Sequence, residues 1–327
     1  MMDRTEIMAY LREDMDRVND LILRSLDSDI DLLNHTNRAL LSRRGKQLRP
    51  MLALLAARAC SGGIVTEDTI RFAAASELLH NATLLHDDVA DGSTQRRGAP
   101  TVMSLLGSRA SVLLGDFWLV RAVGRILDAT RETDRVIRIF SKTLSDLAEG
   151  EMLQLQKASA GDTTQEDYLR IIYNKTASLF VATAQSAAVS VQATPEQEEA
   201  VHAYAEALGI AFQIKDDIFD YEEDARIGKP VGQDLHEQKI TQPLLCALEA
   251  APDRDEEIRS MVVSIADVPS VQADIVRFVK ENGGLESARR HLDKYVDEAV
   301  AALQALPSGR DRDALADLAH FVADRKS

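Results

Sequence analysis

Two short aspartate-rich segments carry the side chains of this sequence that are best suited to chemistry. Both have the pattern Asp-Asp-x-x-Asp, with Asp87, Asp88 and Asp91 in the first and Asp216, Asp217 and Asp220 in the second. Positions i and i+4 share one face of a helix, so the outer aspartates of each segment would project together. Carboxylates that point the same way repel one another unless a cation lies between them, and the negative end of a helix dipole adds to that repulsion. All three aspartates of each segment are therefore predicted to take part in binding a hard divalent ion.

A diphosphate is the ligand that best explains two such segments. Mg²⁺ in proteins prefers a few carboxylates, retained waters and the oxygens of a substrate phosphate. Two clusters facing one another would hold a diphosphate through metal ions. A single Asp-Asp-x-x-Asp in an acidic protein could equally be a solvated turn. The second copy, and the Arg96-Arg97 pair that begins five residues after Asp91, favour a site for metal and diphosphate.

Helices must position these aspartates. Each segment follows a long apolar stretch that has no Pro and few Gly, so each is predicted to end a helix. The first helix is expected from about Thr66 to Asp91, and the second opens at Thr194-Pro195, a cap followed by Pro at the first helical position. A further long helix is predicted from Tyr168 to Val191.

The composition favours one large helical domain. Among 327 residues only 8 are Pro and 16 are Gly, and Ala and Leu are abundant. No linker divides the chain, so a single domain over 1–327 is expected, with an N-terminal layer of amphipathic helices over 1–40 and a catalytic core over 41–327. The formal net charge of −15 argues against nucleic-acid binding, because a phosphate backbone needs a basic face.

The cysteines and the apolar runs bear on the cellular compartment. Cys60 and Cys246 are too few and too far apart for a disulfide framework or a zinc site, which fits a reducing cytoplasm. No apolar run approaches the roughly 18 residues that span a membrane, and the N-terminus has no apolar signal region. The sequence thus predicts a cytoplasmic protein that is not an integral membrane protein.

The segments LLHDDVADGSTQRRG (84–98) and FQIKDDIFD (212–220) resemble the two aspartate-rich motifs of the trans-isoprenyl diphosphate synthases, also called polyprenyl synthetases. The resemblance runs from about residue 40 to the end of the sequence. It implies an all-α, single-domain bundle of long helices around a central substrate cavity, and a homodimer. It also implies a prenyltransferase that joins isopentenyl diphosphate to an allylic diphosphate, farnesyl or geranyl, by ionisation and 1'-4 head-to-tail addition. The resemblance further implies three Mg²⁺ ions with the diphosphate bound.

The resemblance assigns substrate binding to Lys46, Arg49, His80, Arg96 and Arg97. Lys46 and Arg49 lie in Gly-Lys-Gln-Leu-Arg-Pro, which matches the family's GKxxRP element for isopentenyl diphosphate. His80 matches a diphosphate-binding histidine. Arg96 is assigned to the allylic diphosphate and Arg97 to isopentenyl diphosphate. Many family members have a second Arg where this chain has Gln47, so weaker phosphate affinity is expected there.

The resemblance assigns the reacting centre to Lys175, Thr176, Gln213, Lys229 and Lys239. The first two match the family's KTA element, which contacts the allylic diphosphate, and Lys175 is placed near the developing carbocation. Gln213 is placed beside the reacting carbons. The last two lie in a loop that matches GKxxGxDLxxxKxTxP and complete a cationic clamp. In that loop Gln238 and Gln242 replace the usual Gly and Leu.

The helix before Asp87 carries a signal for product length. If the diphosphate head binds at Asp87 and Asp91, the hydrocarbon tail runs along this helix towards its N-terminus. A bulky aromatic residue would close the tunnel early, but the positions that would do so hold Ala82, Thr83 and Leu79. Short-chain family members often have Phe or Tyr there, so the chain resembles the long-chain type. A short-chain farnesyl or geranylgeranyl diphosphate synthase is the alternative.

Two readings from other classes stay open. A terpene cyclase shares the first aspartate pattern, but its second metal motif is typically Asn/Ser/Glu, and it lacks a second diphosphate site such as that of Lys46 and Arg49. A non-catalytic partner subunit of a heterodimeric synthase usually loses the aspartates, whereas both patterns are intact here. No protein base is evident for the proton that leaves after condensation, so released pyrophosphate is expected to accept it.

Overall fold

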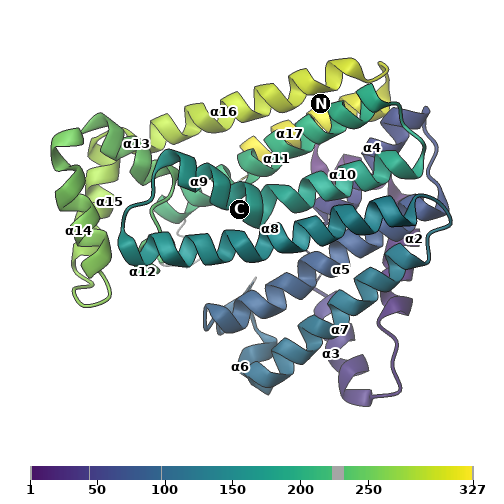
Figure 1. The fold of residues 1–327 in the computed structure, drawn as a ribbon, viewed down its shortest axis with the longest axis horizontal. Coiled ribbons are helices and arrows are strands. Elements are labelled where there is room, and N and C mark those ends of the chain that lie inside the picture. Colours follow the sequence, from purple (N-terminus) through teal and green to yellow (C-terminus); the bar gives the residue numbers. More distant parts are fainter. Residues whose placement is uncertain (1, 44, 97, 223–231, 326–327) are drawn as a thin grey trace. The chain divides into compact units, whose positions relative to one another are not determined.

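The computed structural model describes residues 2–43, 45–96, 98–222 and 232–325. These residues are overwhelmingly helical, which confirms the predicted all-α class (Figure 1). The strands found among them, β1 (Gln95–Arg96) and β2 (Ala99–Pro100), are two residues long and pair antiparallel. The chain divides into two compact units, which are described one at a time. The predicted subdivision into 1–40 and 41–327 stays a prediction.

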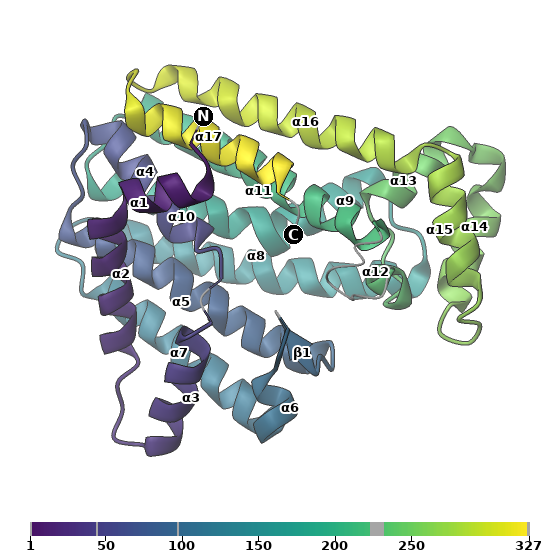
Figure 2. The ribbon, with the colours of Figure 1, turned by 180° about the vertical axis from the view of Figure 1, so that it is seen from behind.

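Unit 1 comprises Met1–Ser141, Ala182–Val201 and Ala305–Leu315. Its own helices are α1 (Arg4–Tyr10), α2 (Arg12–Ser25), α3 (Asp31–Leu41), α4 (Leu48–Ser61), α5 (Glu67–Ala90), α6 (Val102–Leu106) and α7 (Ser108–Leu127). Helix α5 packs against α2, α4 and α7, so the helix that carries the first aspartate segment is the centre of this unit (Figure 2).

Unit 2 comprises Lys142–Val181, His202–Gln304 and Ala316–Ser327. Its own elements are α9 (Gln165–Ile172), the π-helical turn η1 (Tyr173–Ala177), α12 (Gln233–His236), α13 (Gln242–Ala250), the 3₁₀ turn η2 (Pro252–Arg254), α14 (Asp255–Ser264), α15 (Val271–Glu281) and α16 (Gly284–Ala302). Four helices contribute residues to both units: α8 (Thr133–Ala160), α10 (Ser178–Ser190), α11 (Pro195–Tyr221) and α17 (Arg310–Asp324), as does the 3₁₀ turn η3 (Leu303–Ala305). Helix α13 packs against α15 and α16.

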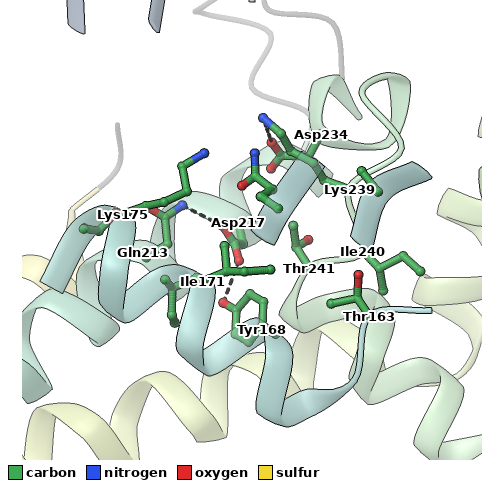
Figure 3. Close-up of a pocket in the computed structure, with 14 residues that line it drawn as sticks. Thr163, Tyr168, Ile171, Lys175, Gln213, Asp217, Asp234, Lys239, Ile240 and Thr241 are labelled. Atoms are coloured by element: carbon green, nitrogen blue, oxygen red, sulfur yellow. Dashed lines mark hydrogen bonds and ion pairs between the residues drawn. The ribbon is translucent and has the colours of Figure 1, made fainter. Parts of the chain in front are cut away.

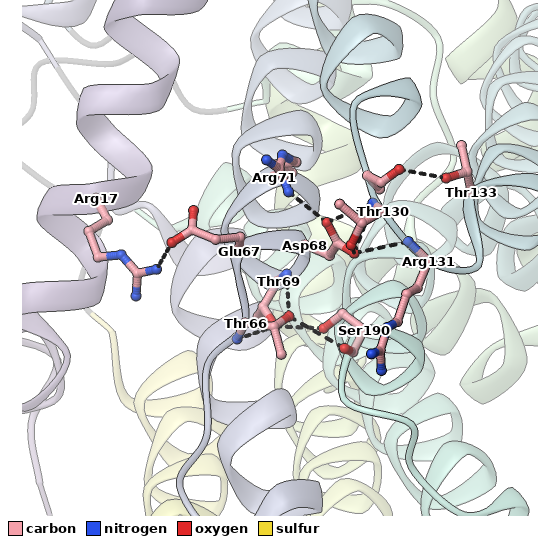
Figure 4. Close-up of polar contacts among 11 residues, drawn as sticks. Arg17, Thr66, Glu67, Asp68, Thr69, Arg71, Thr130, Arg131, Thr133 and Ser190 are labelled. Atoms are coloured by element: carbon pink, nitrogen blue, oxygen red, sulfur yellow. Dashed lines mark hydrogen bonds and ion pairs between the residues drawn. The ribbon is translucent and has the colours of Figure 1, made fainter.

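Helix α5 begins and ends close to the predicted residues. Thr66 is its N-cap and forms a reciprocal capping box with Thr69, each backbone N–H donating to the other's hydroxyl at 3.1 Å. The Thr69 hydroxyl also lies 2.6 Å from the Ser190 hydroxyl (Figure 4). At the other end Asp91 is the C-cap. The first aspartate segment therefore occupies the last turn of α5, where the sequence placed it.

Asp68 ties the first turn of α5 to the turn before α8 (Figure 4). Its buried carboxylate accepts from the Thr130 hydroxyl at 2.9 Å, from the backbone N–H groups of Thr130 and Arg131 at 3.1 and 3.2 Å, and from Arg71 at 2.7 Å. Burial alone would raise the pKa of Asp68, but these hydrogen bonds outweigh it and lower the pKa. The contacts fix the start of α5.

The long helix predicted from Tyr168 to Val191 is present as an unbroken helical segment, but a π-helical turn that was not predicted divides it. The segment contains α9, a π-helical turn over Tyr173–Ala177, and α10, which ends at Ser190. The second predicted helix start is confirmed, since α11 begins at Pro195 and carries Asp216, Asp217 and Asp220 in its last turns. Among the described helices, none combines the length and apolar character that a membrane crossing requires.

Candidate functional site

A cavity of about 120 Å³ in unit 2 brings together most of the side chains assigned to the reacting centre (Figure 3). Lys175, Thr176, Gln213 and Lys239 line it, together with Asp217 of the second aspartate segment. They come from η1, from α11 and from the turn after α12. Part of the remaining wall was not singled out by sequence reasoning, namely Tyr168, Asp234 and Thr241.

A chain of hydrogen bonds crosses this cavity from η1 to α9. The Thr176 hydroxyl donates to Gln213 Oε1 at 2.8 Å, and Gln213 Nε2 donates to Asp217 Oδ1 at 2.9 Å. The Tyr168 hydroxyl donates to Asp217 Oδ2 at 2.6 Å (Figure 3). Gln213 is thereby fixed with its carbonyl towards Thr176 and its amide nitrogen towards Asp217.

Asp217 is the most buried carboxylate of this segment, with 2% of its surface exposed. Burial raises the pKa of Asp217, while its hydrogen bonds from Tyr168 and Gln213 oppose that rise. Burial also raises the pKa of Asp234, and the nearby carboxylates of Asp220 and Asp217 act in the same direction. Burial therefore disfavours the ionised forms of Asp217 and Asp234, and a cation bound beside them would favour those forms.

The π-helical turn puts Lys175 and Thr176 on this wall, and two glycines make room for it. A Cβ on Gly150 of α8 would lie 2.7 Å from Asn174 Cβ, and a Cβ on Gly209 of α11 would lie 2.5 Å from Ala177 Cα. Both distances are shorter than real side chains tolerate. Single π turns inside α-helices recur at functional sites. The apolar periodicity of the sequence did not reveal this one.

The two lysines of the cavity already have acidic partners. Lys175 Nζ lies 2.5 Å from Glu151 Oε2 on α8, and Lys239 pairs with Glu237 and lies 4.0 Å from Asp234 Oδ1. Each ammonium group is therefore held at the cavity by a carboxylate that an incoming diphosphate would have to replace.

The outer aspartates of the second segment are held differently from Asp217. Asp216 Oδ1 lies 2.8 Å from Nη2 of Arg325, and the Asp216 side chain is 41% exposed. Asp220 accepts from the backbone N–H groups of Gln233 and Asp234, both at 3.0 Å, and so caps the short helix α12. These contacts orient both carboxylates, and each carboxylate oxygen can accept more than one partner.

The first aspartate segment repeats this division of roles in unit 1. Asp88, the middle aspartate, is buried at 4% exposure and accepts from Arg96 Nε at 2.7 Å. Asp87 is half-buried and Asp91 is exposed. Arg96 lies on β1, and the backbone of the turn folds back through Ser93 N–H, which donates to the carbonyl of Asp88 at 2.9 Å.

Mg²⁺ fits the outer aspartates on the chemistry of their donors. Among the described residues, no group of three or more His, Cys, Asp or Glu side chains forms a ready metal cage. Mg²⁺ does not need one, because it keeps several waters and uses one or two carboxylates together with phosphate oxygens. The outer aspartates supply hard oxygen donors of that kind, at positions i and i+4 of a helix.

The other substrate and length residues of unit 1 lie on α4, just before it, and on α5. His80 is half-buried on α5, and its carbonyl accepts from the Thr83 hydroxyl at 2.8 Å. Leu79 and Ala82 are each 1% exposed. Arg49 is buried in the first turn of α4, and the carbonyl of Lys46 accepts from Arg4 at 3.3 Å. Arg97 and Lys229, also assigned from the sequence, lie outside the described residues.

The three residues that differ from the family's usual ones each make defined contacts. Gln47 is the N-cap of α4 and donates to Asn19 Oδ1 at 2.8 Å, so it is engaged with α2. Gln238 has φ 59°, the left-handed conformation that explains the usual Gly, and donates to the carbonyl of Val263 at 2.6 Å. Gln242 is 1% exposed and exchanges hydrogen bonds with Gln165.

Known proteins match this chain over nearly its whole length. The polyprenyl synthetase family model matches residues 30–277. Octaprenyl diphosphate synthase of Escherichia coli strain K12 is 39% identical over 326 residues, with 99% of each chain covered. A solved decaprenyl diphosphate synthase from Rhodobacter capsulatus has a TM-score of 0.90 at 37% identity and 98% coverage of both chains.

A second solved structure has a similar likeness. The polyprenyl synthase from Caulobacter crescentus CB15, complexed with calcium and isoprenyl diphosphate, has a TM-score of 0.90 at 33% identity. The match covers 99% of this chain and 98% of that one. The family inferred from the two aspartate segments is thereby confirmed: the chain belongs to the polyprenyl synthetase family.

Proposed function

We propose that the protein is a Mg²⁺-dependent prenyltransferase that makes a long-chain all-trans polyprenyl diphosphate from isopentenyl diphosphate and an allylic primer. The observation that carries this proposal is the cavity where Lys175, Thr176, Gln213 and Lys239 meet the second aspartate segment. The similarity to octaprenyl and decaprenyl diphosphate synthases supports the long-chain product over the short-chain alternative.

We assign Mg²⁺ to the outer aspartates Asp87, Asp91, Asp216 and Asp220. When bound there, the ions neutralise the diphosphate and act as a Lewis acid towards its oxygens. Asp88 and Asp217 are buried against hydrogen-bond donors, so we assign them to holding Arg96 and the Tyr168–Gln213 pair. The number of ions, three by family resemblance, stays a prediction.

The chain's own cations hold the two substrates. The isopentenyl diphosphate is assigned to Lys46, Arg49 and Arg97. The allylic diphosphate is assigned to Arg96, Lys175 and Thr176. Lys229 and Lys239 complete the cationic clamp, and His80 is assigned to diphosphate binding. Lys175 would exchange Glu151 for a diphosphate oxygen, since a primary ammonium group has three donors and a mobile stem. Positive charge beside the leaving diphosphate stabilises the charge that develops on it.

Bond changes at the reacting carbons follow from this arrangement. The allylic C–O bond breaks and the electron pair leaves with pyrophosphate. The double bond of isopentenyl diphosphate attacks the allylic cation and forms a C–C bond, and the proton then lost passes to pyrophosphate. Ile171, Ile172 and Ile240 line the cavity and exclude water from that part of its wall. Gln213 is held with its amide oxygen towards the Thr176 hydroxyl.

We also propose a homodimer in the cytoplasm. Leu113, Val120 and Leu127 recur every seven residues on α7, which places them on one face, and they are 58%, 68% and 58% exposed. Such a stripe supports pairing with the same stripe of a second copy. The two cysteines, half-buried Cys60 and buried Cys246, are free thiols, which supports a reducing compartment.

Purified protein incubated with Mg²⁺, farnesyl diphosphate and labelled isopentenyl diphosphate tests the function. We expect labelled products in the octaprenyl size range after dephosphorylation, and none when the metal is chelated. Products that stop at geranylgeranyl would establish the short-chain alternative. A cyclic hydrocarbon, or no incorporation with either farnesyl or geranyl primer, would contradict the proposal.

A further inference from the structure

Arg325, which follows α17, is a buried cation attached to the second aspartate segment. It is 6% exposed, and its Nη2 lies 2.8 Å from both Asp216 Oδ1 and the carbonyl oxygen of Phe212. Its guanidinium lies over the ring of Phe212, 4.0 Å from the centroid, and 5.4 Å from the centroid of Phe219. Positions 212, 216 and 219 share one face of α11, so Arg325 covers the face that presents Asp216.

Stability alone does not explain this arginine. A buried guanidinium is costly to desolvate, and an apolar side chain of similar volume often serves a core at least as well. Here Nε has no hydrogen-bond partner among the described residues, which leaves part of that cost uncompensated. The feature that an apolar residue could not supply is a positive charge at hydrogen-bond distance from Asp216.

We propose that Arg325 is a positioning residue that acts as the resident counter-charge of Asp216. In the metal-free protein it pairs with Asp216 and offsets repulsion among the closely spaced aspartates. When a divalent ion binds, the same charge repels it. The proposal rests on the proposed function, in which Asp216 is a Mg²⁺ ligand.

Two effects of Arg325 on metal affinity oppose one another, and their sizes decide the sign. Holding Asp216 in one rotamer would favour the metal, but the rotamer entropy of one short side chain is small. Repulsion between a full positive charge and a divalent ion that share one carboxylate is larger in a partly buried site. Arg325 should therefore weaken Mg²⁺ binding, which allows metal and pyrophosphate to leave after each of the many condensations that a long product needs.

The test replaces Arg325 by the neutral residues Met and Gln, and by Lys, which keeps the charge. The matched control is Arg254→Met, because Arg254 also lies over an aromatic ring, that of Phe278 at 5.3 Å, and pairs with Glu257, which belongs to neither aspartate segment. Two quantities are measured by calorimetry and thermal unfolding: the Mg²⁺ concentration that half-saturates binding of inorganic pyrophosphate, and the melting temperature with and without Mg²⁺.

We expect R325M and R325Q to half-saturate at Mg²⁺ concentrations at least about five-fold lower than the wild type. Both should melt lower without metal, with much of that loss recovered when Mg²⁺ and pyrophosphate are present. R325K and Arg254→Met should keep the wild-type Mg²⁺ requirement. An unchanged or raised requirement in R325M and R325Q, with equal melting losses in both conditions, would reduce Arg325 to a packing role and overturn the proposal.

Failure of the proposed function is a separate outcome. A wild-type protein that binds Mg²⁺ and pyrophosphate with the expected Arg325 dependence, but does not extend a primer, would refute the prenyltransferase and support the counter-charge. A wild-type protein that extends the primer while the neutral variants keep its Mg²⁺ requirement would refute only the counter-charge.

Discussion

Asp88 and Asp217 hold equivalent positions in the two aspartate segments, and both are buried against hydrogen-bond donors. Their neighbours at the outer positions are more exposed. Aspartate thus has two different roles within the five positions of each segment. The outer carboxylates present oxygens that can bind a cation, and the middle carboxylate fixes the side chains around it.

Replacing Tyr168 by Phe tests the role of the middle aspartate, Asp217. Asp217 would lose the donor to Oδ2 and stay buried, so we expect the free energy of unfolding to fall by about 1–3 kcal/mol. Prenyl transfer should fall by about ten-fold, because Asp217 also holds Gln213. Urea unfolding and initial rates check this. Tyr295→Phe, at a half-buried tyrosine of α16, is the control and should change neither. Equal stability of Y168F and wild type would contradict the assignment.

Helices that touch through glycine set the geometry of the cavity wall. Gly150 and Gly209 allow α8 and α11 to approach the π-helical turn that carries Lys175 and Thr176. At Gly209 no side-chain movement could relieve an added Cβ, because that Cβ would meet the backbone Cα of Ala177. The position of Lys175 therefore depends on two glycines that are not part of the cavity lining.

Gly209→Ala tests this dependence. The added methyl would overlap Ala177, so η1 must shift, and we expect a loss of about 1–3 kcal/mol in unfolding free energy. The turnover number should fall by about 10²-fold, well beyond what the stability loss explains, because Lys175 and Thr176 move with the turn. Steady-state kinetics below the melting temperature measure it. Gly309→Ala, where a Cβ meets nothing within 4 Å, should behave as wild type. A G209A enzyme with normal turnover would contradict the proposal that the π-helical turn η1 positions Lys175 and Thr176 for the reaction.

The start of α5 should make stability depend on pH in the acid range. The pKa of Asp68 is lowered in the fold, so its contribution is present above the unfolded value of 3.8 and is lost as pH falls through the lower folded value. Asp68→Asn should cost about 2 kcal/mol at neutral pH. The difference from wild type should shrink below about pH 4.

Urea unfolding at several pH values measures this linkage. Glu67→Gln is the matched control, because its ion pair with Arg17 involves a glutamate side chain that is 70% exposed and should contribute almost nothing. A D68N deficit that stays constant down to pH 3 would show that the carboxylate's charge is irrelevant.

At the scale of the whole molecule, the α7 stripe of Leu113, Val120 and Leu127 is the face through which we propose that two copies pair. Val120→Arg places a charge between Leu113 and Leu127 on the α7 stripe. We therefore expect the variant to sediment as a monomer and the wild type to sediment as a dimer. Sedimentation velocity distinguishes the two. Val268→Arg, at a 44% exposed position in the turn before α15, should stay dimeric. A V120R protein that sediments with the same mass as the wild type would exclude the α7 stripe as the dimer interface.

Local signals explain which parts of the molecule the sequence reveals. Apolar periodicity and caps located α5 and α11, because Thr66, Asp91 and Pro195 act within one helical turn of their own positions. Contiguous motifs led to Lys175, Gln213 and Lys239. The π-helical turn was missed, because it depends on close packing by Gly150 and Gly209 from distant segments.

Tyr168, Glu151 and Arg325 were missed for a related reason. Each acts through a partner at least 24 positions away, as Glu151 does with Lys175, and a single sequence carries no sign of such pairing. Their residue types are unremarkable where they stand. The chemistry of the site could be read from motifs, whereas the contacts that hold its side chains in place required the fold.

Under the proposed function, helix α5 would also set the length of the product. Its 24 residues make a rod of about 36 Å, with the first aspartate segment at one end and the Asp68 anchor at the other. An extended isoprene unit adds four carbons, a length of the order of one helical turn, so a tail laid along the whole rod holds about seven units. A bulky side chain placed one turn further from Asp87 should then lengthen the product by about one unit. Product length would then be set by the number of helical turns of α5 between the first aspartate segment and the side chain that blocks the tail.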